Sequence, residues 1–454
     1  MKGFFGTVTP ILFALLLSGC TSTSGAPSRP IDEETLLMSE LSLSDAPAEK
    51  LPELGEKSAL DDYLAYAALN NAGLKAAFLR WKAALEKVPQ AETLPDPRFT
   101  YAYFIQRVET RVGPQRQRFA LNQTFPWLGK LQLQGNAAAA AARAEKARYD
   151  AAKLKLFYQV KEAYYEYYYL ARAIAVTREN MDYVEGLEGV ARAAYSAGLA
   201  PYADVVRTHV ELGKLDDRLK TLNDQAEPIA ARLNAALNRS SDAPLFWPET
   251  IEDEHATFTS EQLLAWLRES NPDLRAIDNQ AAGAKWGVEL AKKNYFPDVM
   301  LGLEGIDTGE ASMPNTKDSG KDPIIASVSI NLPIWWEKYR AGEREAAAQY
   351  RALLRDREER QNRLTADVKW AHYKYRDADR KIELYRGALL PEARQALEVS
   401  LQTYETGKGA FLSVVDAIRV VLEFELSYER ALVDRAQRLA ELEMLVGRTI
   451  PGGE

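Results

Sequence analysis

Most of the chain repeats its apolar residues at helical spacing. From about Leu60 to Ala91, leucine and alanine return every three or four positions, which predicts a first helix ended by a proline-rich stretch, residues 89–97. No proline occurs from Lys130 to Ala200, and strong helix formers dominate, so we expect one helix of roughly 65 residues there. Three more long helices are expected: to about Leu237, from about Trp336 to Tyr404 with a kink at Pro391, and from about Phe411 to Leu445.

Four shorter stretches alternate apolar and polar residues, which is the period of a β-strand with one apolar face. A turn at Gly113-Pro114 separates the first two, and a polar loop over residues 307–322 separates the last two. Each is about ten residues long, the length of a strand that crosses a membrane at a tilt. The expected apolar positions are Phe99, Tyr101, Tyr103 and Ile105; Phe119, Leu121 and Phe125; Val299, Leu301 and Leu303; and Ile324, Ala326, Val328, Ile330 and Leu332.

The long helices are joined in pairs by two related segments, residues 195–206 and 404–416. Glycines in both supply the permissive backbone with which a helix ends and the chain reverses. The segments align with Tyr195 on Tyr404, Gly198 on Gly407, and Val205-Val206 on Val414-Val415. Two helical hairpins with related tips indicate an internal duplication.

Other landmarks repeat at a spacing near two hundred residues. Asn70-Asn71 and the five residues after it match Ser270-Asn271 and its successors, Leu94-Pro95-Asp96 matches Phe296-Pro297-Asp298, and Phe125-Pro126-Trp127-Leu128 matches Leu332-Pro333-Ile334-Trp335. Each half therefore reads as short helix, amphipathic hairpin, long helix, tip and long helix. We expect the following organisation: residues 1–19 a signal peptide, 20–59 a tether, 60–241 the first repeat, 242–258 a linker, 259–448 the second repeat and 449–454 a tail.

The predicted fold class is mainly α with a small β part. Four strands cannot close a barrel, and an open sheet edge in hydrocarbon leaves backbone groups unpaired at several kcal/mol each, so several chains must pool their strands. Two chains would give a barrel filled by side chains, whereas three would give twelve strands and a channel.

The composition of the chain argues against several classes of protein function. The 454 residues are 46% hydrophobic and 27% charged, which argues against intrinsic disorder. A formal net charge of -8 gives no reason to expect a nucleic-acid partner. Three histidines and one cysteine leave little for a zinc site or a nucleophilic dyad, and no phosphate-binding loop is present. We therefore expect no enzyme, no metal site and no cofactor.

The N-terminus indicates the compartment. Lys2 precedes an apolar run, Ile11 to Leu17, that is too short to span a bilayer, and Leu17-Ser18-Gly19-Cys20 follows it. This resembles a bacterial lipoprotein signal, with Cys20 as the lipidation site, because the only cysteine falls where that pattern needs one. Thr21, in place of Asp, implies transport to the outer membrane. The alternative is an ordinary secretory signal in which Cys20 is incidental.

Taken together, these landmarks resemble the TolC family of outer-membrane efflux proteins, in particular its lipidated CusC/CzcC-like branch. The resemblance covers nearly everything after about Leu60. It implies a homotrimer with a 12-stranded barrel among outer-membrane lipids, and a periplasmic α-barrel of twelve helices. It also implies docking to a periplasmic adaptor protein and an inner-membrane pump of RND type. The chain would then be the exit duct of a tripartite efflux system, lipid-anchored in the bacterial outer membrane and extending into the periplasm.

The resemblance also assigns gate residues at the tips. Tyr404 matches the family's linking tyrosine, Asp416 one aspartate of a constricting ring, and Asp204 the aspartate of the first repeat. Ser413 stands where a second ring aspartate is expected, and Gly409, beside Lys408, stands where a linking arginine is expected. We expect a gate with Asp416, Tyr404, Asp204 and Lys408, and adaptor contacts at Gly198, Leu199, Ala200, Gly407, Lys408 and Gly409. A solvated helix terminus is the alternative for Asp416.

Aromatic residues leave two questions open. Trp127, Trp335 and Trp336 fall at strand ends, where they either anchor the protein at a membrane interface or simply pack. Five tyrosines between residues 164 and 169 would pack helix on helix or form a stacking platform, and helical spacing favours packing. The rival to the channel is a periplasmic coiled-coil adaptor or structural protein without a pore. That rival has no use for four strands with an apolar face of membrane length.

Overall fold

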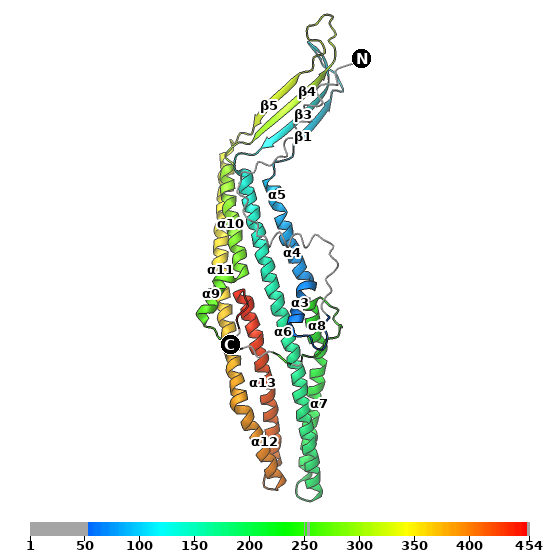
Figure 1. Cartoon of the computed structure of the whole chain (residues 1–454), viewed down its shortest axis with the longest axis vertical. Coiled ribbons are helices and arrows are strands. Elements are labelled where there is room, and N and C mark those ends of the chain that lie inside the picture. Colours follow the sequence, from blue (N-terminus) through cyan, green and yellow to red (C-terminus); the bar gives the residue numbers. More distant parts are fainter. Residues whose placement is uncertain (1–52, 249, 252–254, 452–454) are drawn as a thin grey trace. The chain divides into compact units, whose positions relative to one another are not determined.

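The computed structural model describes residues 53–248, 250–251 and 255–451. Cys20, the signal peptide and most of the tether lie outside these residues. Helices and one antiparallel sheet make up the described chain (Figure 1). The helices are α3 Leu60–Asn70, α4 Ala72–Leu85, α5 Lys87–Glu92, α6 Lys130–Ser196, α7 Tyr202–Asp224, α8 Ala226–Leu237, α9 Ser260–Ser270, α10 Pro272–Lys293, α11 Trp336–Leu384, the π-helix η2 Tyr385–Leu389, α12 Leu390–Glu405 and α13 Phe411–Val446.

The long helices confirm the expected pattern. Helix α6 runs for 67 residues without a break, as the absence of proline predicted. At the kink expected near Pro391, the helix contains the π-helical turn η2, which ends two residues before the proline. The α-helical hydrogen bonding is interrupted there because proline has no N–H to donate and its ring crowds the preceding turn. None of the described helices combines the length and the apolar character needed to cross a membrane.

The first helix was predicted as one element and is three. Asn71 is in extended conformation between α3 and α4, and its side chain accepts a hydrogen bond from Leu74 N at 2.9 Å. Asparagine offers the backbone this alternative to a continuous helix. The return helix of the first hairpin is likewise divided at Gln225, between α7 and α8.

The sheet contains β1 Arg98–Tyr103, β2 Glu109–Thr110, β3 Gly113–Phe125, β4 Val299–Thr308 and β5 Ile324–Ile330. The predicted turn at Gly113-Pro114 is wrong, because both residues begin β3 and the turn lies at 111–112. A Cβ on Gly113 would lie 1.7 Å from the carbonyl oxygen of Gly309, and φ is +131° there, so only glycine fits. Ile105 and Leu332 lie beyond the strand ends, and the short β2 was not expected.

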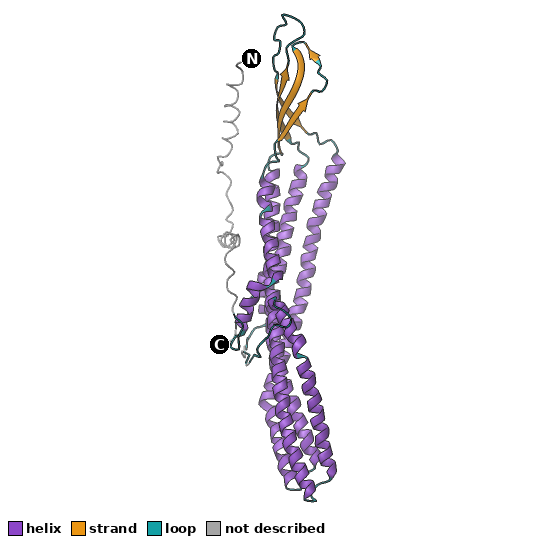
Figure 2. Cartoon of the chain, turned by 90° about the vertical axis from the view of Figure 1, so that its right-hand side faces the viewer, coloured by secondary structure: helices purple, strands orange, loops and turns teal. Residues whose placement is uncertain are grey.

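The strands lie in the order β1-β3-β4-β5, all antiparallel, and they gather beyond one end of the helices (Figure 2). Their register places every expected apolar residue within the strands on one face. Tyr101 stands opposite Phe119, which in turn is opposite Gly305, and Leu121 is opposite Leu303. Arg118, Asn122 and Ser327 belong to the other, polar face.

The duplication is visible in the hydrogen bonds of the two repeats. Asn271 caps α10 as Asn71 caps α4, accepting from Leu274 N at 3.0 Å. The side-chain amide of Asn71 donates to Ala236 O, and that of Asn271 donates to Leu445 O, in each case near the end of the repeat's last helix. Each repeat thus fastens its first helices to its last helix in the same way.

Three apolar clusters hold the helices together. The cluster around Leu156, Val160 and Leu233 contains most of the tyrosine run, and Tyr164, Tyr165, Tyr167 and Tyr168 are all buried. The packing interpretation of these tyrosines is therefore confirmed. A second cluster joins α9, α11 and α13. The third lies at the tips and contains residues from both hairpins, including Ala191, Val205, Tyr404 and Val414.

Candidate gate at the helical tips

Both tips end their first helix with the same hydrogen-bonded turn. In the first, Gly198 N donates to Tyr195 O and Leu199 N donates to Ala194 O, both at 2.9 Å. In the second, Gly407 N donates to Tyr404 O and Lys408 N donates to Thr403 O, also at 2.9 Å. The two glycines have φ of 73° and 72°, as this Schellman motif requires. The duplication therefore extends to the backbone of the tips.

Tyr404 lies inside the tip cluster. Its side chain is 9% exposed, and its ring packs edge-on against Phe411 at 5.3 Å between centroids. The hydroxyl is buried without a hydrogen-bond partner among the described residues. Burial raises the pKa of Tyr404, and the charge of Asp204 adds to this effect. The hydroxyl therefore lies near Asp204 but is not bonded to it within one chain.

Asp204 occupies the first turn of α7. It is 5% exposed, and its Oδ1 lies 3.4 Å from Nη1 of Arg207 on the same helix. A carboxylate at a helix N-terminus is also stabilised by the helix dipole. Its counterpart in the second repeat by the tip alignment is Ser413, which is exposed and carries no charge. The two tips thus have the same backbone conformation but differ in the charge at this position.

Asp416 is exposed and belongs to an ionic cluster that the sequence did not reveal. Arg419, three residues later, lies 3.3 Å from Asp416 Oδ1. The same guanidinium forms a two-pronged ion pair with Glu211 of α7, with Nε 3.0 Å from Oε2. The ammonium nitrogen of Lys214 lies 3.0 Å from Oε1 of Glu211. The hydrogen bond from Arg419 is the main cause that holds the pKa of Glu211 below its ordinary value of 4.5.

The Glu211–Arg419 pair joins the two hairpins, since α7 belongs to the first and α13 to the second. It lies beside a groove of about 640 Å³ with an apolar floor that includes Leu187, Val415 and Ile418. The only sequence signal was the spacing of Asp416 and Arg419, which are neighbours on one helix face. The partner on α7, more than 200 residues away, has no local signal.

The remaining predicted tip residues are at the surface. Leu199 is 81% exposed, and Lys408 is exposed, although its backbone N–H closes the turn. A Cβ on Gly409 would lie 2.7 Å from Oγ1 of Thr403 and 2.9 Å from Tyr404 N. The local packing explains why a glycine occupies the position where an arginine was expected. Among the predicted gate residues, the structure brings Tyr404 and Asp204 close together and leaves Lys408 apart.

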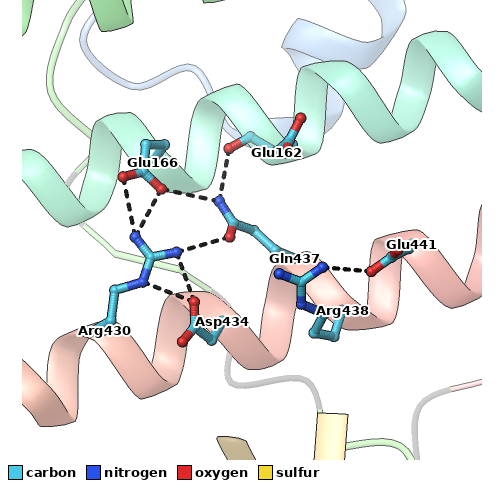
Figure 3. Close-up of polar contacts among 7 residues, drawn as sticks. All are labelled: Glu162, Glu166, Arg430, Asp434, Gln437, Arg438 and Glu441. Atoms are coloured by element: carbon cyan, nitrogen blue, oxygen red, sulfur yellow. Dashed lines mark hydrogen bonds and ion pairs between the residues drawn. The ribbon is translucent and has the colours of Figure 1, made fainter. Parts of the chain in front are cut away.

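Farther from the tips, a second polar cluster joins α6 to α13 (Figure 3). Arg430 binds both oxygens of Glu166, at 2.8 and 3.1 Å, and Asp434 at 2.8 Å. Gln437 accepts from Arg430 and donates to Glu162 O at 3.1 Å. The Arg430 guanidinium also lies 5.0 Å from the ring centroid of Tyr169. We call these residues the α6–α13 clamp.

At the other end of α6, the strand-to-helix junction places the predicted tryptophans. Trp127 is half-buried and stacks on Phe296 at 5.2 Å, so it packs. Trp335 is 71% exposed, and Trp336 is 56% exposed beside Tyr295. The anchoring role remains a prediction for all three tryptophans.

The apolar face of the sheet is uncovered in the described chain. Phe99, Tyr101, Ile324 and Val328 are each more than half exposed, and Leu301 and Leu303 nearly half.

Groups of three or more His, Cys, Asp or Glu side chains suited to a metal are not found among the residues that the structure describes.

A family model described as outer membrane efflux protein matches the chain twice, over residues 64–239 and 263–448. The two matches fall on the two repeats. Sequence comparison with curated proteins gives no significant match.

Solved structures with the same fold cover most of the chain. The outer membrane protein VceC of Vibrio cholerae matches with a TM-score of 0.72 at 17% identity, over 86% of this chain and 97% of VceC. CusC matches with a TM-score of 0.74 at 14% identity, over 86% of this chain and 92% of CusC. The open-state MtrE channel of Neisseria gonorrhoeae matches with a TM-score of 0.68 at 19% identity, over 86% and 89%.

Proposed function

Because the chain belongs to the outer membrane efflux protein family, whose members are outer-membrane channels and not enzymes, we propose that it forms the exit duct of a tripartite efflux system. Three copies pool their strands into a 12-stranded barrel, and the helical hairpins form a periplasmic duct that is gated at its tips. The uncovered apolar face of the sheet carries this proposal. In water such a face would be a liability, whereas in lipid it is the expected surface.

The gate rests on contacts between the hairpins of each protomer. The Glu211–Arg419 ion pair and the tip cluster around Tyr404 hold the second hairpin against the first. Three copies of Asp416 near one axis would repel each other and attract cations. Individual polar links contribute only about 1 kcal/mol, so a gate held by a few of them opens when a partner binds the open state better.

The partners are a periplasmic adaptor and an inner-membrane pump of RND type. The groove beside Glu211, which has an apolar floor and charged walls, and the exposed tip residues Leu199 and Lys408 offer the adaptor a surface at the periplasmic end. Acyl chains on Cys20 would add an anchor in the inner leaflet of the outer membrane. A pore-free adaptor, the rival function, gives no reason for a sheet with one membrane-length apolar face.

The test is purification of the full chain from outer membranes, with its native mass and its conductance in a planar bilayer measured together. We expect a trimer that conducts with a small open fraction, and a mature N-terminus bearing acyl chains on Cys20. A compact monomer or dimer without conductance would overturn the channel. An unmodified cysteine at position 20 would overturn the anchor alone.

A further inference from the structure

The polar face of the sheet carries an excess of positive charge. Strands β1, β3, β4 and β5 contribute three arginines and one carboxylate to this face: Arg98, Arg116, Arg118 and Glu304. The other carboxylate within these strands is Asp307, which stands opposite Gln117 on the other face and accepts a hydrogen bond from it at 3.3 Å. Three arginines and one glutamate give the polar face a net charge of +2, whereas the whole chain has a formal net charge of -8.

Two of these three arginines have no acidic partner among the described residues. Arg118 Nη2 lies 2.8 Å from Glu304 Oε2. Arg98 is exposed, and Arg116 is half-buried with an Nε that has no hydrogen-bond partner in the described chain. A Cβ on Gly309 would lie 2.7 Å from Nη2 of Arg116, so the glycine leaves room for the guanidinium. Two guanidinium groups of each chain are therefore available to solvent or to a ligand.

One row of the polar face is rich in hydrogen-bond donors. Arg98 on β1 stands opposite Asn122 on β3. Asn122 in turn stands opposite Gly302, and Gly302 opposite Ser327, so the row crosses all four strands. A Cβ on Gly302 would lie 2.5 Å from both Asn122 Oδ1 and Ser327 Oγ, because these two side chains lean over the glycine. A guanidinium, an amide and a hydroxyl all donate hydrogen bonds. We call Arg98, Asn122 and Ser327 the donor row.

We propose that the donor row forms an anion-selective ring in the outer-membrane part of the duct, and that the exported solutes include anions that carry a carboxylate. This inference rests on the proposed barrel, in which the polar face lines the lumen and three chains place three copies of Arg98 at one level. Rings of arginine or lysine side chains select anions in pores, and a guanidinium binds a carboxylate with two parallel hydrogen bonds. The sheet and the tips lie at opposite ends of the helices, so the ring acts in series with Asp416 and with opposite sign (Figure 2).

Carboxylates lie on both sides of the donor row but not within it. Glu304 belongs to the next row away from the helices, and Arg118 neutralises it. On the helix side, Asp298 lies 2.8 Å from Lys130 Nζ. Asp96 is exposed and lies in the loop before β1, outside the strand. A solute that leaves the helical duct thus passes Asp96 before it reaches the basic part of the lumen.

Reversal potentials of open channels in a KCl gradient test the ring. Arg98→Gln should raise the permeability ratio of potassium to chloride by about threefold, because it removes three charges that act over roughly one Debye length. Ser327→Asp adds an acid to the same row and should raise the ratio while the arginine stays in place. The matched control is Arg107→Gln, which makes the same charge change in the turn between β1 and β2 and should leave the ratio unchanged.

An organic anion tests the solute class. With potassium benzoate in place of KCl, the unmodified channel should carry a benzoate current, and Arg98→Gln should reduce that current by about the same factor. A benzoate current that is equal in the two channels would overturn the assignment of carboxylate-bearing solutes.

The outcomes separate the ring from the channel. Permeability ratios that are equal in the unmodified channel, Arg98→Gln and Ser327→Asp, in protein whose native mass is that of a trimer, overturn the ring and leave the channel standing. A shift of the same size in Arg107→Gln would assign the effect to overall charge and would also overturn the ring. If Arg98→Gln does not assemble, the ratio of Ser327→Asp decides alone. A native mass of one chain, without conductance, overturns the channel itself.

Discussion

At the scale of single residues, the two hairpins are joined at the tip by an ion pair that the family resemblance did not single out, as well as by the buried ring of Tyr404. Arg419 faces Glu211 across the two hairpins and Asp416 along its own helix. Tyr404 contributes a buried ring whose hydroxyl has no partner among the described residues. Ionic contacts of this kind respond to charge and pH, whereas ring packing does not.

Removing the charge of Glu211 should loosen the gate. Glu211→Gln weakens a link of about 1 kcal/mol, which corresponds to about a fivefold rise in the open fraction of single channels. Swapping the charges, with Glu211→Arg and Arg419→Glu together, should restore the low open fraction. Asp216→Asn is the control, since it removes an exposed ion pair with Lys220 inside α7 and breaks no contact between the hairpins, so the open fraction should stay unchanged. If the open fraction of the Glu211→Gln channel equals that of the unmodified channel, this ion pair does not hold the gate closed.

Lowering the pH should break the same ion pair, because Glu211 becomes protonated. Because Arg419 lowers the pKa of Glu211 below 4.5 in the folded protein, the ion pair stabilises the closed tip above that pH and is lost as the pH falls through the lowered value. We expect the open fraction to rise only below about pH 4.5. The open fraction of the Glu211→Gln channel should not rise in this pH range. An equal rise in the variant would show that another carboxylate is responsible.

Asp416 should control selectivity, separately from gate strength. In the proposed trimer, Asp416→Ala removes three negative charges near the axis, so the cation preference of open channels should fall. Tyr404→Phe removes an unsatisfied buried hydroxyl, so it should keep selectivity and leave stability equal or about 1 kcal/mol higher. Reversal potentials in a salt gradient measure the first effect. If they do not move in Asp416→Ala, the constriction lies elsewhere.

At the scale of elements, sequence periodicity predicted most of what the structure contains. The long helices, the alternation in the four strands and the duplicated tips were all readable, because each depends on local pattern or on a proline or glycine. The breaks at Asn71 and Gln225 were missed, since the apolar period continues through them. Gly113 was assigned to the turn, because its close contact with Gly309 is nearly 200 residues distant. The Glu211–Arg419 pair was missed for the same reason.

The tip glycines give the clearest test at this scale. Gly407→Ala forces a side chain into the left-handed conformation, which costs about 1 kcal/mol or more. Gly186→Ala, within α6 where the chain leaves open space, should instead raise stability by about 0.5 to 1 kcal/mol. Thermal unfolding of both variants measures the difference. Equal effects of the two would show that the turn does not constrain the tip.

At the scale of the whole molecule, the two faces of the sheet have different surroundings. Leu303 and Ser329 lie on adjacent strands, on the apolar and the polar face respectively. Leu303→Arg should reduce assembled trimer in the outer membrane, because an arginine on a lipid-facing strand costs about 2 to 4 kcal/mol near the bilayer midplane. Ser329→Arg, facing the lumen, should assemble normally and shift ion selectivity. Normal assembly of both would mean that the apolar face does not meet lipid.

The β1–β3 and β4–β5 ladders have matching registers, with Phe99↔Leu121 in the first repeat and Leu301↔Val328 in the second, as expected from a duplication. A half-length ancestor with one hairpin and one helical tip would close the same ring as six identical subunits, and fusion of two copies would turn that hexamer into a trimer. Six identical tips must all carry the same charge. After fusion the two copies diverge, and here Asp204 is buried against Arg207 while its counterpart Ser413 is neutral and exposed. Such a fusion would allow one tip to specialise without changing the other.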